Sequence, residues 1–446
     1  MRHWIVLYKV RLTACAALAS LSPRARMIPS ALLPWTSRPG FKDDMMRMVW
    51  CLLAFGVLEL SSIQLQAGAA PAGGNLQVVG EARNKLIPIA LEGFTGEVAS
   101  VLKFDLEVMG CKVVPSADAA FLVRGKADGS VVGALTDKAG NPGFNRRYSG
   151  GNLRDQAHAL SNDVIQALTG VPGVASTRVL FKMKTGLRAE EVFLSDYDGH
   201  KPVALTNDKT LVSAPRWSPD HSKVFYTTWL KRGGIENTTV IRQNMKTGER
   251  EVMARYRGLN TGGALSPQGF LAMILSRGGS PDVYVAPPGW KFMEDLKGQN
   301  LRRMCVTREE ENGVTWSPDG QWLCFATRAN GKRMLVKVAA QGGNMIRIPT
   351  SGVLNPSEPN WSPDGKSIAF TAAMGGFNVC VIPAQGGAAT VVAAGEAPTW
   401  APNSRNLIFT RRGVNKRQLA IVDVPTKQVK ILPAFVGSAS QPAWGN

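Results

Sequence analysis

Histidine and cysteine are scarce in this sequence, and their spacing forms no recognisable metal centre. Only 4 histidines and 6 cysteines occur in 446 residues. The cysteines form no Cys-x-x-Cys pair, and no Cys and His residues stand at zinc-ligand spacing, so a zinc module is excluded. The chain also lacks a G-x-x-x-x-G-K-S/T loop, an H-E-x-x-H motif and a G-x-S-x-G elbow. These absences argue against phosphate-loop enzymes, zinc proteases and α/β-hydrolases.

Acidic residues are outnumbered by basic ones. There are 33 Asp and Glu against 52 Lys and Arg, which gives a formal net charge of +19. A surface this basic suits nucleic acid, anionic lipid or an acidic protein partner, and composition does not choose among them. Glycine and proline are abundant instead, with 46 and 27 residues, and no collagen period orders them. This composition favours many short strands joined by tight turns.

A membrane-spanning apolar run is also missing from the part of the sequence that is richest in apolar residues. The run Val49–Leu60 is about a dozen residues long, shorter than the ~20 that cross a bilayer. Arg47 precedes it, and Ala67-Gly68-Ala69 follows it as an A-x-A cleavage signal. Residues 45–69 are therefore predicted to be a cleavable signal peptide, and the mature chain is expected to hold no integral membrane segment.

A signal peptide is expected at the extreme N-terminus, whereas 44 residues precede this one. We predict that residues 1–44 are a mis-assigned upstream segment and that Met45 or Met46 is the initiator. Residues 70–83 are predicted to be a flexible N-terminal segment. Because an exported chain does not meet chromosomal DNA, nucleic acid is not an expected partner.

A repeated segment fills the C-terminal half of the chain. It combines a short strand ending in Trp, a Pro-Asp-Gly type turn and an apolar strand, as in PNWSPDGKSIAFT from Pro359. The equivalent positions are Trp217, Leu265, Trp316, Trp361, Trp400 and Trp444, at intervals of 48, 51, 45, 39 and 44 residues. This period is typical of a four-stranded propeller blade.

One blade is divided between the two ends of the repeat region. Three strands are predicted at Val179–Met183, Glu191–Ser195 and Val203–Thr206, with no Trp strand ahead of them. The isolated Trp444 strand supplies the missing one. Residues 175–446 are therefore predicted to form a six-bladed β-propeller closed by its C-terminal strand, which leaves no long sheet edge unpaired.

Residues 84–172 have a different pattern, which predicts a small α/β domain. Strands are expected at Leu86–Leu91, Cys111–Val114, Ala120–Arg124 and Ser130–Thr136, and helices at Val98–Met109 and Leu153–Leu168. The fold class is thus an α+β N-terminal domain followed by an all-β six-bladed propeller.

The recurring tryptophans admit two interpretations, a sugar-binding site or blade packing. We favour blade packing for Trp217, Trp316, Trp361, Trp400 and Trp444, because a residue that recurs once per blade at one place packs one blade on the next. The histidines of the exported part are interpreted as solvated or capping residues rather than metal ligands; they are His158, His200 and His221. The cysteines outside the first 69 residues are expected to be packed free thiols; they are Cys111, Cys305, Cys324 and Cys380.

These residues together resemble the TolB family, the periplasmic component of the Tol-Pal envelope system. The resemblance covers residues from about 84 to 446. It is carried by Leu168–Gly173 with Thr177–Val179, by the turn Leu194–Gly199, by the Trp-Ser-Pro-Asp copies and by Pro442–Trp444. The resemblance implies a periplasmic monomer without a cofactor that docks the peptidoglycan-associated lipoprotein and engages a TolA-like inner-membrane protein through its N-terminal segment. It also implies a role in outer-membrane integrity and in constriction during cell division, and no catalysis.

The loops that enter the inner strands converge on one mouth of the propeller, where we expect the lipoprotein to dock. The residues predicted to form this site are Arg257, Asn260, Thr261, Glu311, Asn312, Ser357, Glu358 and Glu396. Asn260 and Asn312 are the strongest candidates, since an amide can satisfy a partner backbone without burying a charge. Two alternatives stay open. The residues could be ordinary solvated turns, and the chain could be a secreted propeller enzyme such as a metal-dependent polysaccharide lyase.

Overall fold

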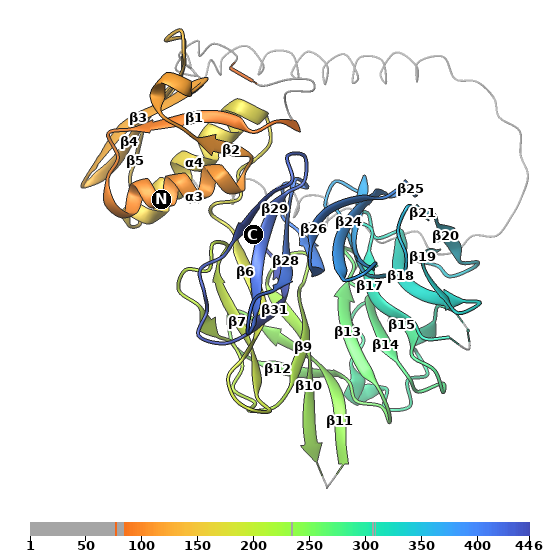
Figure 1. Cartoon of the computed structure of the whole chain (residues 1–446). Coiled ribbons are helices and arrows are strands. Elements are labelled where there is room, and N and C mark those ends of the chain that lie inside the picture. The colour runs from red at the N-terminus through yellow and green to blue at the C-terminus, as the bar shows by residue number, and fades with distance from the viewer. Residues whose placement is uncertain (1–75, 78–83, 233–234, 306, 308) are drawn as a thin grey trace, which may run out of the picture. The chain divides into compact units, whose positions relative to one another are not determined.

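The computed structural model describes residues 76–77, 84–232, 235–305, 307 and 309–446 (Figure 1). The predicted upstream segment, the signal peptide and most of residues 70–83 lie outside the described residues. Within the described part of the chain, no helix is both long and apolar enough to cross a membrane.

The first described domain is a five-stranded sheet with two helices. The strands are β1 (Ile87–Glu92), β2 (Cys111–Val113), β3 (Phe121–Asp128), β4 (Ser130–Asp137) and β5 (Pro142–Tyr148), in the order β2-β1-β3-β4-β5. β1 is parallel to β2 and β3, and the β3, β4 and β5 pairings are antiparallel. Helices α3 (Gly96–Val108) and α4 (Leu153–Thr169) pack on each other and on the sheet (Figure 1). β5 is the strand that the sequence did not predict.

Residues at the two ends of helix α4 explain where this helix begins and ends. The Asn152 side chain accepts a hydrogen bond from the Asp155 amide over 2.9 Å, and the Asp155 carboxylate accepts one from the Asn152 amide over 3.2 Å. This capping box satisfies two amides that have no partner inside the helix. Gly170 ends the helix with a left-handed φ of 70°.

Six antiparallel four-stranded sheets follow, as the repeat predicts. From the inner strand outward, the first two blades are β9 (Val212–Trp217), β10 (Lys223–Arg232), β11 (Ile235–Asn244) and β12 (Arg250–Ala254), then β13 (Asn260–Leu265), β14 (Leu271–Leu275), β15 (Asp282–Ala286) and β16 (Arg302–Arg303). The third and fourth blades are β17 (Asn312–Trp316), β18 (Trp322–Ala329), β19 (Lys332–Ala339) and β20 (Ile346–Ile348), then β22 (Pro356–Trp361), β23 (Ser367–Ala373), β24 (Phe377–Pro383) and β26 (Thr390–Ala394). The fifth and sixth blades are β27 (Glu396–Trp400), β28 (Asn406–Arg412), β29 (Arg417–Asp423) and β30 (Gln428–Ile431), then β31 (Ala439–Trp444), β6 (Arg178–Lys184), β7 (Glu190–Asp196) and β8 (Val203–Ala204). A short parallel pair, β21 (Thr350–Ser351) with β25 (Gly387–Ala388), joins the third blade to the fourth.

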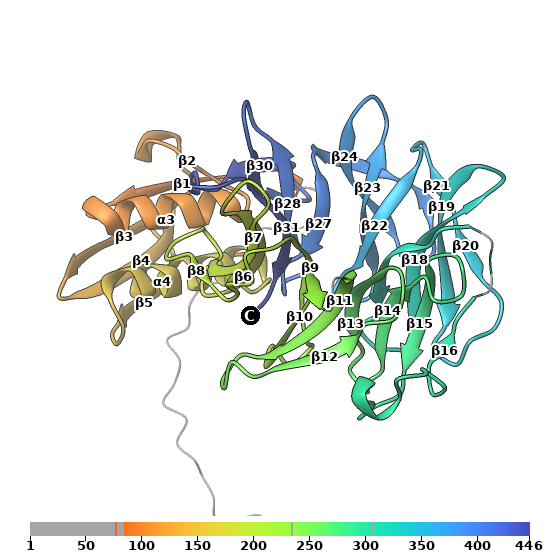
Figure 2. The ribbon, with the colours of Figure 1, turned by 90° about the horizontal axis from the view of Figure 1, so that it is seen from below.

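The last strand closes the ring. β31 pairs antiparallel with β6, and Trp444 stands opposite Val179 (Figure 2). The four-stranded sheet β31-β6-β7-β8 therefore joins the C-terminal strand to the first three propeller strands. The predicted fold class, an α/β domain followed by a six-bladed propeller, is confirmed.

The tryptophans lie between blades. Trp316, Trp400 and Trp444 are buried, and Trp217 and Trp361 are partly buried. The Trp316 indole N–H donates to the Ala264 carbonyl of the preceding blade over 2.9 Å, and the Trp217 indole N–H donates to the Ala443 carbonyl over 3.3 Å. Each of these two bonds links the inner strands of neighbouring blades.

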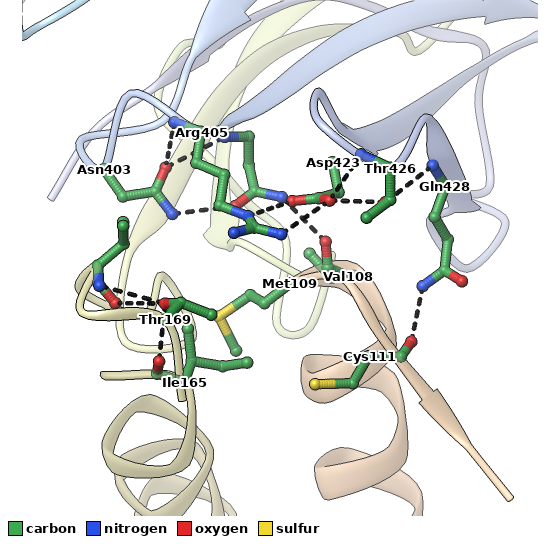
Figure 3. A network of polar contacts seen from close by, with 12 residues as sticks. Val108, Met109, Cys111, Ile165, Thr169, Asn403, Arg405, Asp423, Thr426 and Gln428 are labelled. Carbon is green, nitrogen blue, oxygen red and sulfur yellow. Dashed lines mark hydrogen bonds and ion pairs between the residues drawn. The ribbon is translucent and has the colours of Figure 1, made fainter. Parts of the chain in front are cut away.

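The α/β domain and the propeller share one apolar core and a set of polar contacts. Leu102 and Val164 from the helices belong to the same buried cluster as Phe181, Ile408 and Trp444 from the propeller. Figure 3 shows the polar contacts at this junction, where propeller side chains reach the backbone that leaves helix α3. All four cysteines among the described residues are buried and free, as predicted.

Candidate functional site: the propeller mouth

Each inner strand has a bulge at the same place. The register of its pairing with the second strand shifts in all six blades, and the residue three positions before the Trp position has a left-handed φ. These residues are Ala214 (φ 51°), Gly262 (81°), Gly313 (60°), Glu358 (52°), Ala397 (51°) and Gln441 (51°). All six line one cavity of about 430 Å³, which we call the mouth cavity.

Four of the six bulges place a residue other than glycine at positive φ, and neighbouring blades hold such bulges in place. A residue other than glycine at positive φ costs roughly 1–3 kcal/mol, and such residues gather at functional sites. The amide of Ala214 donates to the Gln441 side chain over 3.0 Å, and the amide of Ala397 donates to the Glu358 carboxylate over 2.9 Å. Side chains of one blade thus fix the backbone of the next, and the ring aims six backbone segments into one cavity.

The structure brings six of the eight predicted mouth residues together. Those that line the mouth cavity are Thr261, Glu311, Asn312, Ser357, Glu358 and Glu396. The Asn312 side-chain oxygen has no hydrogen-bond partner among the described residues. Arg257 is exposed on the loop before β13 and does not line the cavity.

Asn260, one of the two strongest candidates from the sequence, is fully buried and serves its own loop. Its amide nitrogen donates to the carbonyls of Tyr256 and Gly258, over 2.7 and 3.0 Å. Its side-chain oxygen accepts from the Tyr256 amide over 2.8 Å. Because the side chain is 0% exposed and bonded at both ends, no polar atom of it is open to a partner. The structure corrects the prediction for this residue to a role in holding the loop.

Acidic and basic side chains both line the mouth cavity, and burial raises the pKa of two of its carboxyl groups. Burial raises the pKa of Glu311 to about 7, and the nearby Asp282 carboxylate adds to the shift while a hydrogen bond from Thr307 opposes it. Burial also raises the pKa of Glu396, whose carboxylate pairs with Arg417 over 3.3 Å. Glu311 therefore changes its charge near neutral pH.

A larger cavity of about 900 Å³ adjoins the mouth cavity, and we call it the basic groove. The two share Phe377 and Glu396. Its cationic lining residues are Lys184, Arg411, Arg412, Lys416 and Arg417, against the two acids Glu190 and Glu396. Phe377 is 55% exposed and Val414 is 99% exposed. Exposed apolar side chains among cations are typical of a surface that binds an acidic and partly apolar segment.

A third cavity of about 480 Å³, the floor cavity, is lined by the Trp-Ser-Pro segments and includes residues from all six blades. It shares Arg216 and Thr399 with the mouth cavity, so the two lie on one central channel. Residues three positions before each Trp position line the mouth, and the Trp positions line the floor together with the residues just before them.

Comparison with known proteins decides the family. A family model described as the TolB beta propeller domain matches residues 165–446. The chain belongs to the TolB family. A curated relative from Alcanivorax borkumensis, named "Tol-Pal system protein TolB", is 35% identical over 130 residues, which are 28% of this chain and 29% of that protein. One of the same name from Francisella tularensis subsp. holarctica is 28% identical over 230 residues, 49% of each chain. The chain therefore spans only about a quarter to a half of the length of these relatives.

A solved structure agrees with the fold of the TolB family. The crystal structure of TolB from Acinetobacter baumannii covers 81% of this chain and 96% of its own, with a TM-score of 0.69 and 22% sequence identity. This likeness shows that the α/β domain and the propeller occur together in a known fold.

The histidines of this TolB family member differ in part from their predicted roles. His158 is buried, and its Nδ1 lies 2.8 Å from the Asp105 carboxylate, so the prediction of a solvated or capping role is wrong for this residue. Its place on α4, one turn from the buried Ser161 and two from Ile165, was the signal available in the sequence. His221 lies in a turn with its ring edge against Trp217. No group of three His, Cys, Asp or Glu side chains that could hold a metal occurs in the described ranges.

Proposed function

We propose that the protein is a non-catalytic, periplasmic interaction scaffold of a Tol-Pal system. In this proposal it is a monomer that binds the peptidoglycan-associated lipoprotein on the mouth cavity and the basic groove. The observation that carries the proposal is the ring of six left-handed bulges, which presents six backbone segments to one cavity. We propose the Tol-Pal system because the curated relatives carry its name, and we propose a scaffold role because of the propeller fold.

The chemistry of the surface supports a protein partner. An aromatic anchor, Phe377, stands where the mouth cavity meets the basic groove, and half of its side chain is exposed. Aromatic and arginine side chains at the centre of a contact area usually carry most of the binding energy. Arg411 and Arg412 line the same groove. Because they are cations, we expect the segment of the partner that binds there to be acidic.

Two further parts of the proposal extend to the rest of the envelope. The segment 70–83 engages a TolA-like inner-membrane protein, and the export signal at 45–69 delivers the chain to the periplasm. With partners at both membranes, the scaffold supports outer-membrane integrity and constriction during cell division.

Calorimetric titration with the soluble domain of the organism's lipoprotein tests the proposal. Phe377→Ala is expected to cost about 2–4 kcal/mol of binding free energy, and Asn312→Ala about 1–3 kcal/mol. Leu296→Ala is the matched control, because Leu296 is 58% exposed and lines none of the three cavities. Unchanged affinity of the Phe377→Ala, Asn312→Ala double variant would move the site away from this face, and no binding by the parent protein would refute the scaffold itself.

A further inference from the structure

The residue before each Trp position faces the central channel, and one of these six residues is a cation. The set is Arg216, Ala264, Thr315, Asn360, Thr399 and Ala443, and all six line the floor cavity. Arg216 also lines the mouth cavity, so its side chain lies where the two halves of the channel meet.

The other polar members of this ring join neighbouring blades. The Asn360 side-chain oxygen accepts a hydrogen bond from the Trp400 amide over 2.9 Å. The Thr315 and Thr399 hydroxyls accept from the amides of Trp361 and Trp444, over 3.4 and 3.3 Å. A guanidinium has five donors and no acceptor, so Arg216 cannot replace these bonds. Its presence in the ring is not explained by blade packing.

Arg216 has no bonded partner within the described residues. Burial lowers the pKa of its guanidinium, and Glu358 is the acid whose charge opposes that shift, at a separation longer than an ion pair. One Glu358 oxygen is already occupied, since it accepts from the Thr371 hydroxyl over 2.8 Å and from the Ala397 amide over 2.9 Å. Arg216 is partly buried, and a partly buried cation without a bonded anion is costly, so a ligand that supplies the anion offsets that cost.

The floor cavity is open to an anion. None of the side chains that line it is acidic, as far as the described residues go, and the carboxylate of the last residue, Asn446, which also lines it, forms no ion pair with Arg216. Asn360 also lines this cavity, on the blade across the ring from Arg216, and its oxygen is occupied by the Trp400 amide, so only its N–H groups are left to act as donors. A guanidinium pairs most strongly with a planar group that offers two oxygens.

We propose that Arg216 forms a carboxylate-binding site in the central channel of the propeller. The carboxylate is either that of a small free acid, which enters through the floor cavity, or an Asp or Glu side chain that the docked lipoprotein inserts through the mouth. The free-acid source does not depend on the proposed function, whereas the lipoprotein source rests on it.

The test uses acetate as the probe and the full protein with ¹⁵N-labelled arginine side chains. Acetate replaces chloride at constant ionic strength, and the Nε–H signal of Arg216 is assigned by its loss in Arg216→Lys. We expect a saturable shift of this signal and a melting temperature that is higher in acetate than in chloride. We also expect Arg216→Gln to weaken acetate binding roughly 10- to 100-fold, as the loss of a charged hydrogen bond does.

Arg333→Gln is the matched control, because Arg333 lines the mouth cavity and its loss changes the net charge equally. It should keep the acetate response. No saturable shift in the parent protein, or an equal response in Arg216→Gln, would overturn the site; if Arg216→Gln does not fold, the shift in the parent protein decides alone.

The source is identified by repeating the titration with saturating lipoprotein domain. If the lipoprotein supplies the carboxylate, the Arg216 signal moves on complex formation and acetate no longer shifts it. If acetate still binds in the complex, the free acid is the ligand. If the lipoprotein does not bind at all, the scaffold proposal fails while the acetate titration still decides this one.

Discussion

The side chain of Asn406 in the propeller donates a hydrogen bond of 2.9 Å to the backbone carbonyl of Val108, the last residue of helix α3. The last four carbonyls of a helix have no partner within it. The Gln428 side chain bonds the Glu107 carbonyl in the same turn and the Cys111 carbonyl just beyond it. Propeller side chains thus supply a C-terminal cap for a helix of the other domain.

Removal of this cap should destabilise the junction. Asn406 is 0% exposed, and Asn406→Ala leaves the buried Val108 carbonyl without its partner, so we expect a loss of about 1–3 kcal/mol in the free energy of unfolding. Urea denaturation followed by tryptophan fluorescence measures it. Asn145→Ala, at an exposed position of β5, is the control and should change stability by less than about 0.5 kcal/mol. Equal effects of the two substitutions would contradict the capping role.

A second buried contact at the junction should make stability depend on pH. His158 Nδ1 lies 2.8 Å from Asp105, the Tyr197 hydroxyl donates to the same carboxylate, and Asp198 lies 4.0 Å from His158 Nε2. Burial acts to lower the pKa of His158, but the hydrogen bond and charge of Asp105 outweigh it and raise that pKa overall. Burial also raises the pKa of Asp105, which would favour a neutral pair. We take the ion pair as the native form, since two donors point at this carboxylate.

The raised pKa of His158 determines whether stability rises or falls with pH. The contribution of His158 is fully present below its unfolded value of about 6.5 and is lost as the pH rises through the higher folded value. We therefore expect the free energy of unfolding to fall as the pH rises above about 6.5 in the parent protein and to vary less in His158→Gln. That variant should lose about 3–5 kcal/mol at pH 6, as breaking a buried pair does. Parallel pH profiles for the two proteins would show that His158 is not the titrating group.

The blades were predictable from the sequence, but the bulges at the mouth were not. Trp and Pro-Asp-Gly recur because each blade needs the same packing residue and the same tight turn, so a repeat of identical letters marks them. The left-handed position is occupied by different residues, such as Ala214, Glu358 and Gln441. Only Gly262 and Gly313 gave a local signal, because glycine adopts positive φ without strain. The remaining bulges are imposed by pairing between strands, which the sequence does not display.

β5 was missed for a related reason. Its residues Pro142–Tyr148 are mostly polar and partly exposed, and the strand exists because β4 offers an edge for it to pair with. Asn260 shows the converse error. A polar residue in a loop is usually solvated, and only its surroundings reveal that its side chain turns inward to hold the loop backbone.

Asn260 should therefore affect folding rather than binding. Asn260→Ala removes three hydrogen bonds and leaves the backbone N–H and carbonyl of the buried Tyr256 without these partners, so we expect a loss of about 2–4 kcal/mol in stability. Lipoprotein affinity of the folded fraction should change by less than about threefold, which is within 1 kcal/mol. Calorimetric unfolding and titration of one sample measure both. A stable variant with weakened binding would restore Asn260 to the contact site.

Glu311 at the mouth is expected to carry the clearest pH signature. Its side chain is 2% exposed, one carboxylate oxygen accepts from the Thr307 hydroxyl over 2.6 Å, and the other has no hydrogen-bond partner among the described residues. Asp282 nearby is fully buried and pairs with Arg303 over 2.6 Å. Burial first, and the Asp282 charge second, place the pKa of Glu311 at about 7 against an ordinary value of 4.5.

A carboxyl group whose folded pKa is raised is best tolerated when it is protonated. The folded protein pays no penalty below the unfolded pKa, and the penalty grows as the pH rises from about 4.5 through about 7. Glu311→Gln keeps the shape and an acceptor for Thr307 but never ionises. We therefore expect this variant to gain up to about 3 kcal/mol over the parent protein at pH 8, and to gain nothing at pH 4.

Urea denaturation at both pH values measures the difference. Glu358→Gln, a change of the same charge in the same cavity, is the control, and its effect should not follow this profile. A Glu311→Gln variant that is no more stable at pH 8 than at pH 4, relative to the parent, would show that Glu311 ionises without cost in the folded protein.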